Sequence, residues 1–337
     1  MNVAIYGAGA MGTVLGAYLA KAGYEIDLVN RNKDHVDAMN RTGAKVIGKA
    51  NFVQPVRACL PDQMGDSYDI ILLMTKQRDN KKIAAFLEPH LSERGVICTM
   101  QNGIPEPVIA DVIGADRTIG CTMSWGATFH GRGVAELTSE ATPDTLTFAI
   151  GKYGDVDEER FAYIVKMLSS MGQVTVEENF IGARWAKLMI NAAFSGLSVV
   201  TGATFGALSK ECATRRLAVT IIKECIDVAH AAGIKIEPIQ GKDVVKLMYY
   251  KTWIKQRFAM FILPFAMRKH KNIRSSMLRD IERGRETEVD AINGVVAAYG
   301  DKYGVDTPLN DKVISVVRQI EAGELVPDWK NIRYFIY

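Results

Sequence analysis

The stretch NVAIYGAGAMG, residues Asn2–Gly12, decides the fold of this chain. Its first five letters are rich in β-forming residues and predict a short strand. The strand runs directly into the pattern GxGxxG at Gly7, Gly9 and Gly12, and apolar residues at helical spacing follow as far as Gly23. A second apolar run, EIDLV, comes next. A strand, this glycine pattern, a helix and a strand within about thirty residues predict a Rossmann-type dinucleotide-binding unit.

The glycine pattern is expected to bind a diphosphate. Gly7 would make the tight turn, Gly9 would let the backbone approach a pyrophosphate, and Gly12 would let the helix pack closely on the strand. The free N–H groups and the dipole at the helix N-terminus favour an anion there. The alternative is a glycine-rich turn that only packs tightly. The candidate cofactor-binding residues of this pattern are Gly7, Ala8, Gly9, Ala10, Met11 and Gly12.

The end of the second strand indicates which cofactor is bound. Sites for NAD usually place an acidic residue there, whereas this sequence has Asn30 and Arg31, 18 and 19 residues beyond Gly12. An arginine can hold a 2′-phosphate through charge-assisted hydrogen bonds, so the sequence favours NADP(H). The alternative is that Arg31 is solvated and Asp27 binds the ribose, although Asp27 comes early in the strand.

Two further predicted strands end in polar residues. DIILLM, Asp69–Met74, leads into Lys76, and GVICTM, Gly95–Met100, leads into Asn102. Ligands of open parallel sheets bind outside the carboxyl ends of the strands, so Lys76 and Asn102 are expected near the nicotinamide. The alternatives are a surface lysine and a plain Asn-Gly turn.

The order of the predicted elements gives an α/β Rossmann nucleotide-binding domain followed by an all-α helical C-terminal domain. Ile119–Ser124 and about 131–150 are predicted as strands that complete the sheet, before an amphipathic helix at Asp157–Gly172 and a last strand. From Ile181 onward the pattern is almost entirely helical. We therefore expect an NADP(H)-binding domain at residues 1–179 and a substrate and catalytic domain at residues 180–337.

Composition and charge exclude several classes of protein. Apolar residues make up 48% and charged residues 23% of the 337 residues, which is typical of a soluble globular enzyme. The formal net charge of +3 is too weak to indicate a nucleic-acid partner. The chain has five cysteines without CxxC spacing, and Cys98 and Cys225 lie in apolar runs. This pattern indicates a reducing compartment, with no disulfide framework and no metal site.

The expected location is the cytoplasm, since a strand begins directly after Met1 and leaves no room for a signal peptide. The apolar stretch FAMFILPFAM, Phe258–Met267, is too short to span a bilayer and contains a proline. We interpret it as core or as a buried interface, so no membrane partner is expected. The apolar region Tyr249–Met267 is a candidate helix-to-helix interface that would allow a homodimer.

Polar residues interrupt two of the later helical patterns. Lys187 lies in the apolar run RWAKLMINAAFSG, with Asn191 one turn later and Ser195 one turn beyond, so the three share one face. Ser275-Ser276 predicts a helix start, and Glu288 is expected well inside that helix. A lysine beside a carboxylate suits proton transfer. The alternatives are a lysine whose stem covers apolar surface and a glutamate on a solvated helix face.

Together these residues resemble the ketopantoate reductase (2-dehydropantoate 2-reductase) family. The resemblance covers nearly the whole chain and rests on the N-terminal GxGxxG, a strand that ends in Lys, a strand that ends in Asn-Gly, WxKLxxN, and SSMLxDIxxGRxTExDxING. The family reduces a 2-oxo acid to a 2-hydroxy acid with NADPH, on the pantothenate route to coenzyme A.

The resemblance also implies roles for individual residues. Lys187 would be the general acid that protonates the alkoxide, and Glu288 would be its acidic partner near the substrate and the cofactor. The resemblance implies Asn102, Asn191 and Ser276 as substrate-binding residues and Lys76 as a residue near the cofactor. With the residues taken from the sequence itself, the substrate-binding candidates are Asn102, Asn191, Ser195 and Ser276, and the cofactor-side candidates are Asn30, Arg31, Lys76, Asn102 and Glu288.

One departure from the family pattern leaves the substrate open. The family often has a second asparagine followed by Pro-Leu, where this chain has Ser195-Gly196-Leu197. A related NAD(P)H-dependent reductase of another 2-oxo acid, or of an imine as in opine formation, is therefore the alternative. A nucleotide-binding sensor without catalysis is a second alternative, which the presence of Lys187, Glu288, Ser276 and Asn102 disfavours.

Overall fold

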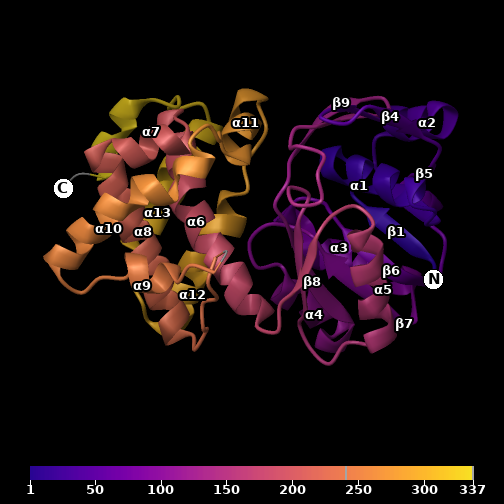
Figure 1. The fold of residues 1–337 in the computed structure, drawn as a ribbon, viewed down its shortest axis with the longest axis horizontal. Helices are drawn as coiled ribbons and strands as arrows, with labels where there is room; N and C mark the ends of the chain where they lie inside the picture. Colours follow the sequence, from indigo (N-terminus) through magenta and orange to yellow (C-terminus); the bar gives the residue numbers. More distant parts are fainter. Residues whose placement is uncertain (240, 336–337) are drawn as a thin grey trace. The chain divides into compact units, whose positions relative to one another are not determined.

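The computed structural model describes residues 1–239 and 241–335, which form two compact units. The first unit comprises Met1–Gln101 and Pro105–Phe180, and the second comprises Asn102–Ile104 and the chain from Ile181 onward (Figure 1). The first is an α/β unit built on a largely parallel sheet and the second is helical. The predicted fold class, a Rossmann-type domain followed by an all-α domain, is confirmed.

The main sheet of the first unit has eight strands in a doubly wound order. In spatial order the strands are β12 (Val174–Val176), β11 (Phe148–Lys152), β8 (Thr118–Met123), β7 (Leu91–Thr99), β6 (Tyr68–Leu73), β1 (Val3–Tyr6), β2 (Ile26–Val29) and β5 (Arg57–Cys59). The neighbours from β8 through β7, β6, β1 and β2 to β5 are parallel, and β11 joins the edge of β8 in the antiparallel direction.

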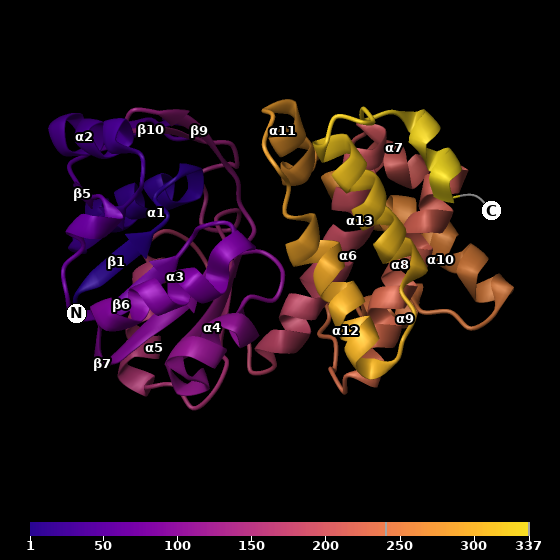
Figure 2. The same ribbon diagram turned by 180° about the vertical axis from the view of Figure 1, so that it is seen from behind.

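Alternate residues of the central strands are buried on opposite faces of the sheet, because successive side chains of a strand point in opposite directions. Ile5 and Leu72 pack with helices α1 (Ala10–Lys21) and α5 (Glu158–Ser169). Ala4 and Ile71 pack on the other face with α3 (Asn80–Leu87) and α4 (Glu106–Ile113), which lie along the sheet in Figure 2. Burial on both faces explains why these strands are continuous apolar runs.

A second, smaller sheet corrects one prediction. The region 131–150 was expected to complete the main sheet, and only β11 does so. β9 (Ala127–Gly131) and β10 (Val134–Leu137) instead form a four-stranded sheet with β3 (Ala44–Gly48) and β4 (Phe52–Gln54). Helix α1 contacts both sheets and is therefore covered on two sides.

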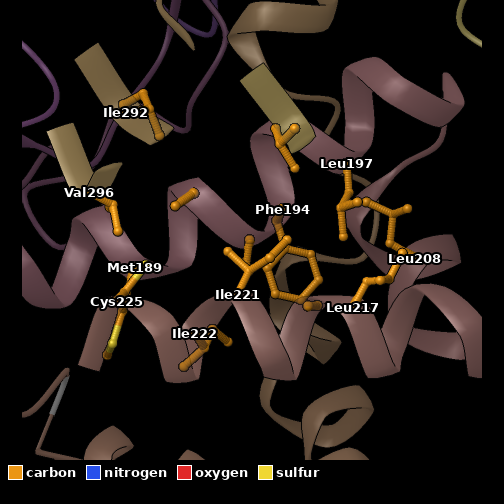
Figure 3. Packing of buried hydrophobic residues seen from close by; sticks show 14 of the residues in the cluster. Met189, Phe194, Leu197, Leu208, Leu217, Ile221, Ile222, Cys225, Ile292 and Val296 are labelled. Atoms are coloured by element: carbon orange, nitrogen blue, oxygen red, sulfur yellow. The ribbon is translucent and has the colours of Figure 1, made fainter. Parts of the chain in front are cut away.

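The second unit is a bundle of helices around one core. Its longest helix, α6, runs from Phe180 to Thr201 and packs Met189, Phe194 and Leu197 against α8 (Figure 3). Trp185 is fully buried, and its indole N–H donates to the Cys225 carbonyl oxygen of α8 at 2.8 Å. The described part of this unit also contains α7 (Phe205–Lys210), α8 (Cys212–Ala231), α9 (Val244–Met248), α10 (Trp253–Ala266), α11 (Ser276–Glu282), the π-helix η6 (Asp290–Gly294), α12 (Val295–Tyr303), α13 (Pro308–Glu321) and two short 3-10 helices, η5 (Arg268–His270) and η7 (Trp329–Phe335).

The prediction that Glu288 lies well inside the helix begun at Ser275-Ser276 is wrong. That helix, α11, begins at Ser276 as expected, with Ser275 as the N-cap, but it ends at Glu282. Gly284 follows with φ +63, in the left-handed region that glycine adopts readily and that ends helices. Glu288 therefore lies in the irregular segment that precedes the π-helix.

The apolar stretch Phe258–Met267 is only partly core. On α10, Ala259 and Leu263 are buried, whereas Phe258, Phe261 and Phe265 are exposed. The prediction of core is therefore confirmed for Ala259 and Leu263 and wrong for the three phenylalanines, whereas the alternative of a buried interface stays a prediction. Within the described part of the chain, no helix combines the length and the apolar character needed to cross a bilayer.

Candidate functional site

The loops that follow β1, β2, β6 and β7 leave the sheet at one level. The register pairs Tyr6 with both Val29 and Leu73, and Leu73 with Thr99. Backbone bonds continue the pairing past the strand ends: the Met74 N–H donates to the Tyr6 carbonyl at 2.8 Å. The carboxyl-end edge of the sheet therefore carries the glycine turn, Asn30-Arg31, the Lys76 loop and the end of β7, as the sequence predicts.

The three glycines of the turn differ in what surrounds them. A Cβ on Gly7, whose φ is +103, would lie 2.7 Å from the Thr75 nitrogen, and a Cβ on Gly12 would lie 2.7 Å from the Gly7 carbonyl oxygen. Packing of the protein itself therefore demands both glycines. A Cβ on Gly9 would meet no described atom closer than the Gly7 oxygen at 4.0 Å. The missing side chain at Gly9 is not needed for packing, and it fits a turn whose backbone approaches a dinucleotide diphosphate.

The Ala8 carbonyl oxygen is a fixed point of the glycine turn, because three side chains converge on it. The Asn30 amide donates to it at 2.8 Å, the Thr13 hydroxyl donates at 3.1 Å, and His35 Nε2 lies 3.1 Å away. The Gly133 N–H donates to His35 Nδ1 at 2.9 Å, so the neutral ring carries its proton on Nε2. Burial lowers the pKa of His35, which favours this neutral ring. Asn30 thus orients the turn.

Arg31 and Asp27, the two alternatives for recognising the ribose end, lie in different surroundings. Asp27 is buried and pairs with the Arg57 guanidinium, and the Tyr68 hydroxyl donates to it at 2.6 Å. Arg31 is exposed, and its charge partly offsets the rise that burial causes in the pKa of Tyr6 at the end of β1. The carboxylate of Asp27 is therefore engaged within the sheet, while Arg31 lies at the carboxyl-end edge.

Lys76 and Asn102 follow adjacent strands, and a buried glutamine ties their loops together. The Gln101 side-chain amide donates to the Thr75 carbonyl at 2.9 Å and to Asn80 Oδ1 at 2.8 Å. Lys76 and Asn102 are each half-buried directly beside these bonded residues. Ile104, two residues after Asn102, belongs to the core cluster of the helical unit. Both ends of the Asn102 segment are therefore anchored.

Helix α6 exposes one narrow stripe. Between Arg184 and Thr201, Lys187, Ile190 and Asn191 are half-buried and all other residues are buried. Ser195, one turn beyond Asn191, is 8% exposed. Lys187, Asn191 and Ser195, which we call the α6 stripe, thus share one face as predicted. A lysine at this place in a buried helix is positioned by the helix rather than free to move as on a surface.

The start of α11 is attached to the far end of the α6 stripe. The buried Ser275 hydroxyl donates to the Ser195 carbonyl at 3.3 Å and accepts from the Leu278 N–H at 3.0 Å. This capping bond places the exposed Ser276 at the first helical position of α11. Ser276 and Ser195 are therefore brought to the same part of the helical unit.

The segment that carries Glu288 is also attached to α6. Asn293 of the π-helix is fully buried, and its amide donates to the Ala192 carbonyl at 3.1 Å and to Asn310 Oδ1 at 3.0 Å. Glu288 is half-buried and its carbonyl accepts from the Ile292 N–H. A Cβ on Gly196 would lie 2.3 Å from Val313 Cγ1 and 3.2 Å from Asn293 Oδ1. Close packing of α13 and the π-helix on α6 therefore accounts for the glycine at 196. π-helical turns are rare and recur at functional sites.

Four polar residues organise these segments: His35, Gln101 and Asn293, which sequence reasoning missed, and Ser275, which it recognised only as part of a helix start. Each is buried and bonded to a segment distant in sequence, such as His35 to Gly133 across 98 residues. Gln101 alone carried a usable signal, because it stands directly after a predicted strand beside Asn102.

Comparison with known proteins matches both units of the chain to one protein family. Residues 3–150 match the family described as "Ketopantoate reductase PanE/ApbA", and residues 179–321 match "Ketopantoate reductase PanE/ApbA C terminal". A 2-dehydropantoate 2-reductase of Pyrococcus horikoshii is 28% identical over 326 residues, which cover 96% of this chain and 98% of that protein. One of Archaeoglobus fulgidus is also 28% identical, over 96% and 98% of the two chains.

Solved structures with the same fold cover most of the chain. A PanE/ApbA family ketopantoate reductase from Ralstonia eutropha has a TM-score of 0.80 at 25% identity, over 96% of this chain and 99% of that one. A D-mandelate dehydrogenase solved with NADH and anilino(oxo)acetate has a TM-score of 0.81 at 23% identity, over the same shares. The glycine turn, the α6 stripe and these matches over both units together place the chain in the ketopantoate reductase PanE/ApbA family.

Proposed function

We propose that this protein is an NADPH-dependent 2-oxo acid reductase that converts ketopantoate to pantoate, the step on the pantothenate route to coenzyme A. The observation that carries the proposal is the α6 stripe, where Lys187 and Asn191 are partly exposed on a buried helix. The segments of Ser276 and Glu288 are hydrogen-bonded to the next turns of that helix. The relatives named 2-dehydropantoate 2-reductase support the same reaction.

Cofactor binding is assigned to the first domain, residues 1–179. The first-turn N–H groups at Ala10, Met11 and Gly12 would hold the diphosphate, with Gly9 leaving room for its approach. Arg31 would pair with the 2′-phosphate, whereas Asp27, occupied by Arg57 and Tyr68, would not reach the ribose. The reduced nicotinamide supplies the hydride when it is bound. NADH, which the solved D-mandelate dehydrogenase contains, is the alternative cofactor.

Proton transfer is assigned to Lys187 in the second domain, residues 180–337. Reduction of a ketone leaves negative charge on its oxygen, and the Lys187 ammonium would stabilise that charge and donate the proton to the oxygen. Helix α6 holds the lysine in a fixed place, which reduces the entropic cost of orienting the proton donor. Glu288 would lie near the lysine and the substrate hydroxyl and orient them.

Substrate binding is assigned to polar groups around the same stripe. The Ser276 hydroxyl at the start of α11 would donate to the substrate carboxylate, and the amides of Asn102 and Asn191 would bind its oxygens. Lys76, half-buried at the sheet edge, would add positive charge on the cofactor side. Ser195 would take the place of a longer amide side chain.

A second substrate is favoured by one observation. Ser195 is shorter than the asparagine expected there, and Gly196 adds no side chain because Val313 and Asn293 pack against it. A smaller side chain on the α6 stripe suits a bulkier 2-oxo acid or an imine. The reaction type is the same in both cases, because it depends on Lys187.

The experiment that tests this proposal is a substrate panel. NADPH oxidation is followed with ketopantoate, with 2-oxo acids of increasing bulk, and with 2-oxo acids plus an amine. The highest kcat/KM is expected for ketopantoate. Turnover of another acid without turnover of ketopantoate would replace the substrate but keep the reaction type. Tight NADPH binding without any turnover would instead indicate a nucleotide sensor.

A further inference from the structure

Helix α10 has two apolar faces, and the fold covers only one of them. Ala259 and Leu263 are buried against the core of the helical unit. Large apolar side chains on the opposite side remain between 50% and 70% exposed: Trp253, Ile254, Phe258, Phe261 and Phe265. In both views α10 lies at the edge of its unit, beside α8 and α9 (Figures 1 and 2). Soluble monomers rarely expose so many large apolar side chains together.

Four of these residues form a regular row, which we call the α10 stripe. Ile254, Phe258, Phe261 and Phe265 are spaced four, three and four residues apart. At about 100° per residue they fall within a band of roughly 60°, opposite the buried face. The rings of Phe261 and Phe265 are 5.5 Å apart. This is the spacing of knob residues that pack a helix against another helix.

The exposed area is sufficient for a small, specific dimer. Aromatic side chains present about 200 Å² each, so five side chains that are 50–70% exposed offer roughly 600 Å². Two such faces would bury about 1,200 Å², the lower end of specific interfaces. A face on a single helix is too narrow for a larger obligate assembly, but it matches a copy of itself.

We propose that the α10 stripe binds the α10 stripe of a second copy of this chain, with the two helices antiparallel. The row is symmetric about its midpoint, so a two-fold axis there pairs Ile254 with Phe265 of the second copy and Phe258 with Phe261 of the second copy. Antiparallel packing also brings opposite ends of the two helix dipoles together.

The charges around the stripe predict how this association responds to salt. Residues 238–278 contain nine lysines and arginines and one aspartate. Lys255 and Arg257 flank the stripe on its two sides. Like charges therefore meet at the rim of the dimer, and screening them strengthens association. The same composition would also suit an anionic membrane surface, which has the opposite salt dependence.

Sedimentation equilibrium of the full chain over micromolar concentrations tests the proposal. The wild type is expected to be a dimer whose dissociation constant falls as salt is raised. Phe261→Glu should raise that constant about 30-fold or more, the effect of losing a central contact. Val53→Glu, at a valine of β4 in the first unit that is 52% exposed, should leave it unchanged. Far-UV circular dichroism and melting temperature check that both variants fold.

A charge pair tests the antiparallel register directly. The double variant Phe258→Lys/Phe261→Glu places a lysine opposite a glutamate in both pairings, so it should recover a dimer that Phe261→Glu alone lacks. A wild type that stays monomeric, or a Phe261→Glu variant as dimeric as the wild type, would overturn the proposal. A monomer that co-sediments with phosphatidylserine vesicles would also overturn it in favour of a lipid surface. Failure of the double variant to recover dimerisation would overturn the antiparallel pairing.

Discussion

At the scale of single residues, the proposed preference for NADPH over NADH depends on Arg31 and on the carboxylate of Asp27. Asp27 is held by Arg57 and Tyr68, so Arg31 is the side chain at the end of β2 that remains to recognise the ribose end. Arg31→Ala is expected to raise the dissociation constant of NADPH about 10- to 100-fold, the range for a lost charge-assisted hydrogen bond.

Fluorescence titration with NADPH and with NADH measures this difference. NADH affinity should change by less than about 3-fold, because its ribose offers no phosphate to the arginine. Lys33→Ala removes another exposed cation two residues away, which pairs with Asp37, and serves as the control. An equal loss of affinity for both cofactors would remove the 2′-phosphate assignment.

Gly9 and Gly12 offer a second test at residue scale. Gly9→Ala adds a methyl group that meets no described atom within 4.0 Å except the Gly7 oxygen, so the melting temperature should hold while NADPH binding weakens. Gly12→Ala forces its methyl to 2.7 Å from backbone oxygen and should cost about 1–3 kcal/mol of unfolding free energy. If Gly9→Ala binds NADPH as tightly as the wild type, the diphosphate does not lie over this turn.

The glycine turn was predictable from sequence because all its parts are local. Strand, glycines and helix follow one another within Asn2–Gly23. The side chains that orient the turn were not. His35 stands in a polar helix, and its bonds to Ala8 and Gly133 join positions 27 and 98 residues apart. No periodic pattern in one sequence reports such pairings.

At the scale of elements, His35 joins α2 (Lys33–Thr42), the glycine turn and the β9–β10 turn. Burial lowers its pKa in the folded state below the unfolded value of about 6.5. The neutral ring therefore contributes stability above that pH, and the contribution is lost as the pH falls through the folded pKa. His35→Gln retains a donor and an acceptor but cannot titrate.

Denaturant unfolding from about pH 7 to about pH 5 compares the two proteins. The unfolding free energy of the wild type should fall more steeply than that of His35→Gln, by at most about 1.4 kcal/mol per pH unit. Parallel curves for the wild type and the variant would show that His35 is not held as a neutral ring.

Glu224 of α8 caps the start of α13. Its carboxylate accepts from the backbone N–H groups of Leu309 and Asn310 at 3.0 and 3.1 Å, and from the Asn310 amide at 2.8 Å. Glu224→Ala leaves these buried donors unpaired and should cost about 3 kcal/mol of unfolding free energy. Asp227→Ala removes a neighbouring carboxylate that pairs with Lys223, and it should cost less than about 1 kcal/mol. Equal melting temperatures for the two variants would contradict the capping role.

The elements show where sequence patterns lose information. The region of β10 was predicted as strand, but its partner β3 lies about ninety residues earlier in the chain, so its sheet could not be assigned. β9, which pairs with β10, lies mostly before the predicted region and was missed. The apolar run of α10 left core and a buried interface open, because such a run does not show which side faces outward. The end of α11 at Glu282, shortly before Gly284, was overlooked because the helical pattern resumes after Glu288.

At the scale of the whole molecule, alternation of strands and helices followed by helices alone predicts both units and their order. Each unit has its own core, with Ile5 and Leu72 in one and Trp185 and Phe194 in the other. The sequence predicted two parts of the candidate site: the polar residues that follow the strand ends and the polar residues that interrupt apolar helices. Ser275 and Asn293 bring the segments of Ser276 and Glu288 to α6 through tertiary hydrogen bonds. Sequence spacing does not encode these bonds.

The central claim is that Lys187 supplies the proton for reduction of a 2-oxo acid. Steady-state kinetics and NADPH titration of Lys187→Ala test it, with Lys223→Ala, a half-buried lysine of α8, as the control. Lys187→Ala is expected to lower kcat about 100-fold or more while NADPH binds as in the wild type, because only the proton donor is lost. Lys223→Ala should keep its kcat. A Lys187→Ala enzyme that turns over ketopantoate at the wild-type rate would contradict the account.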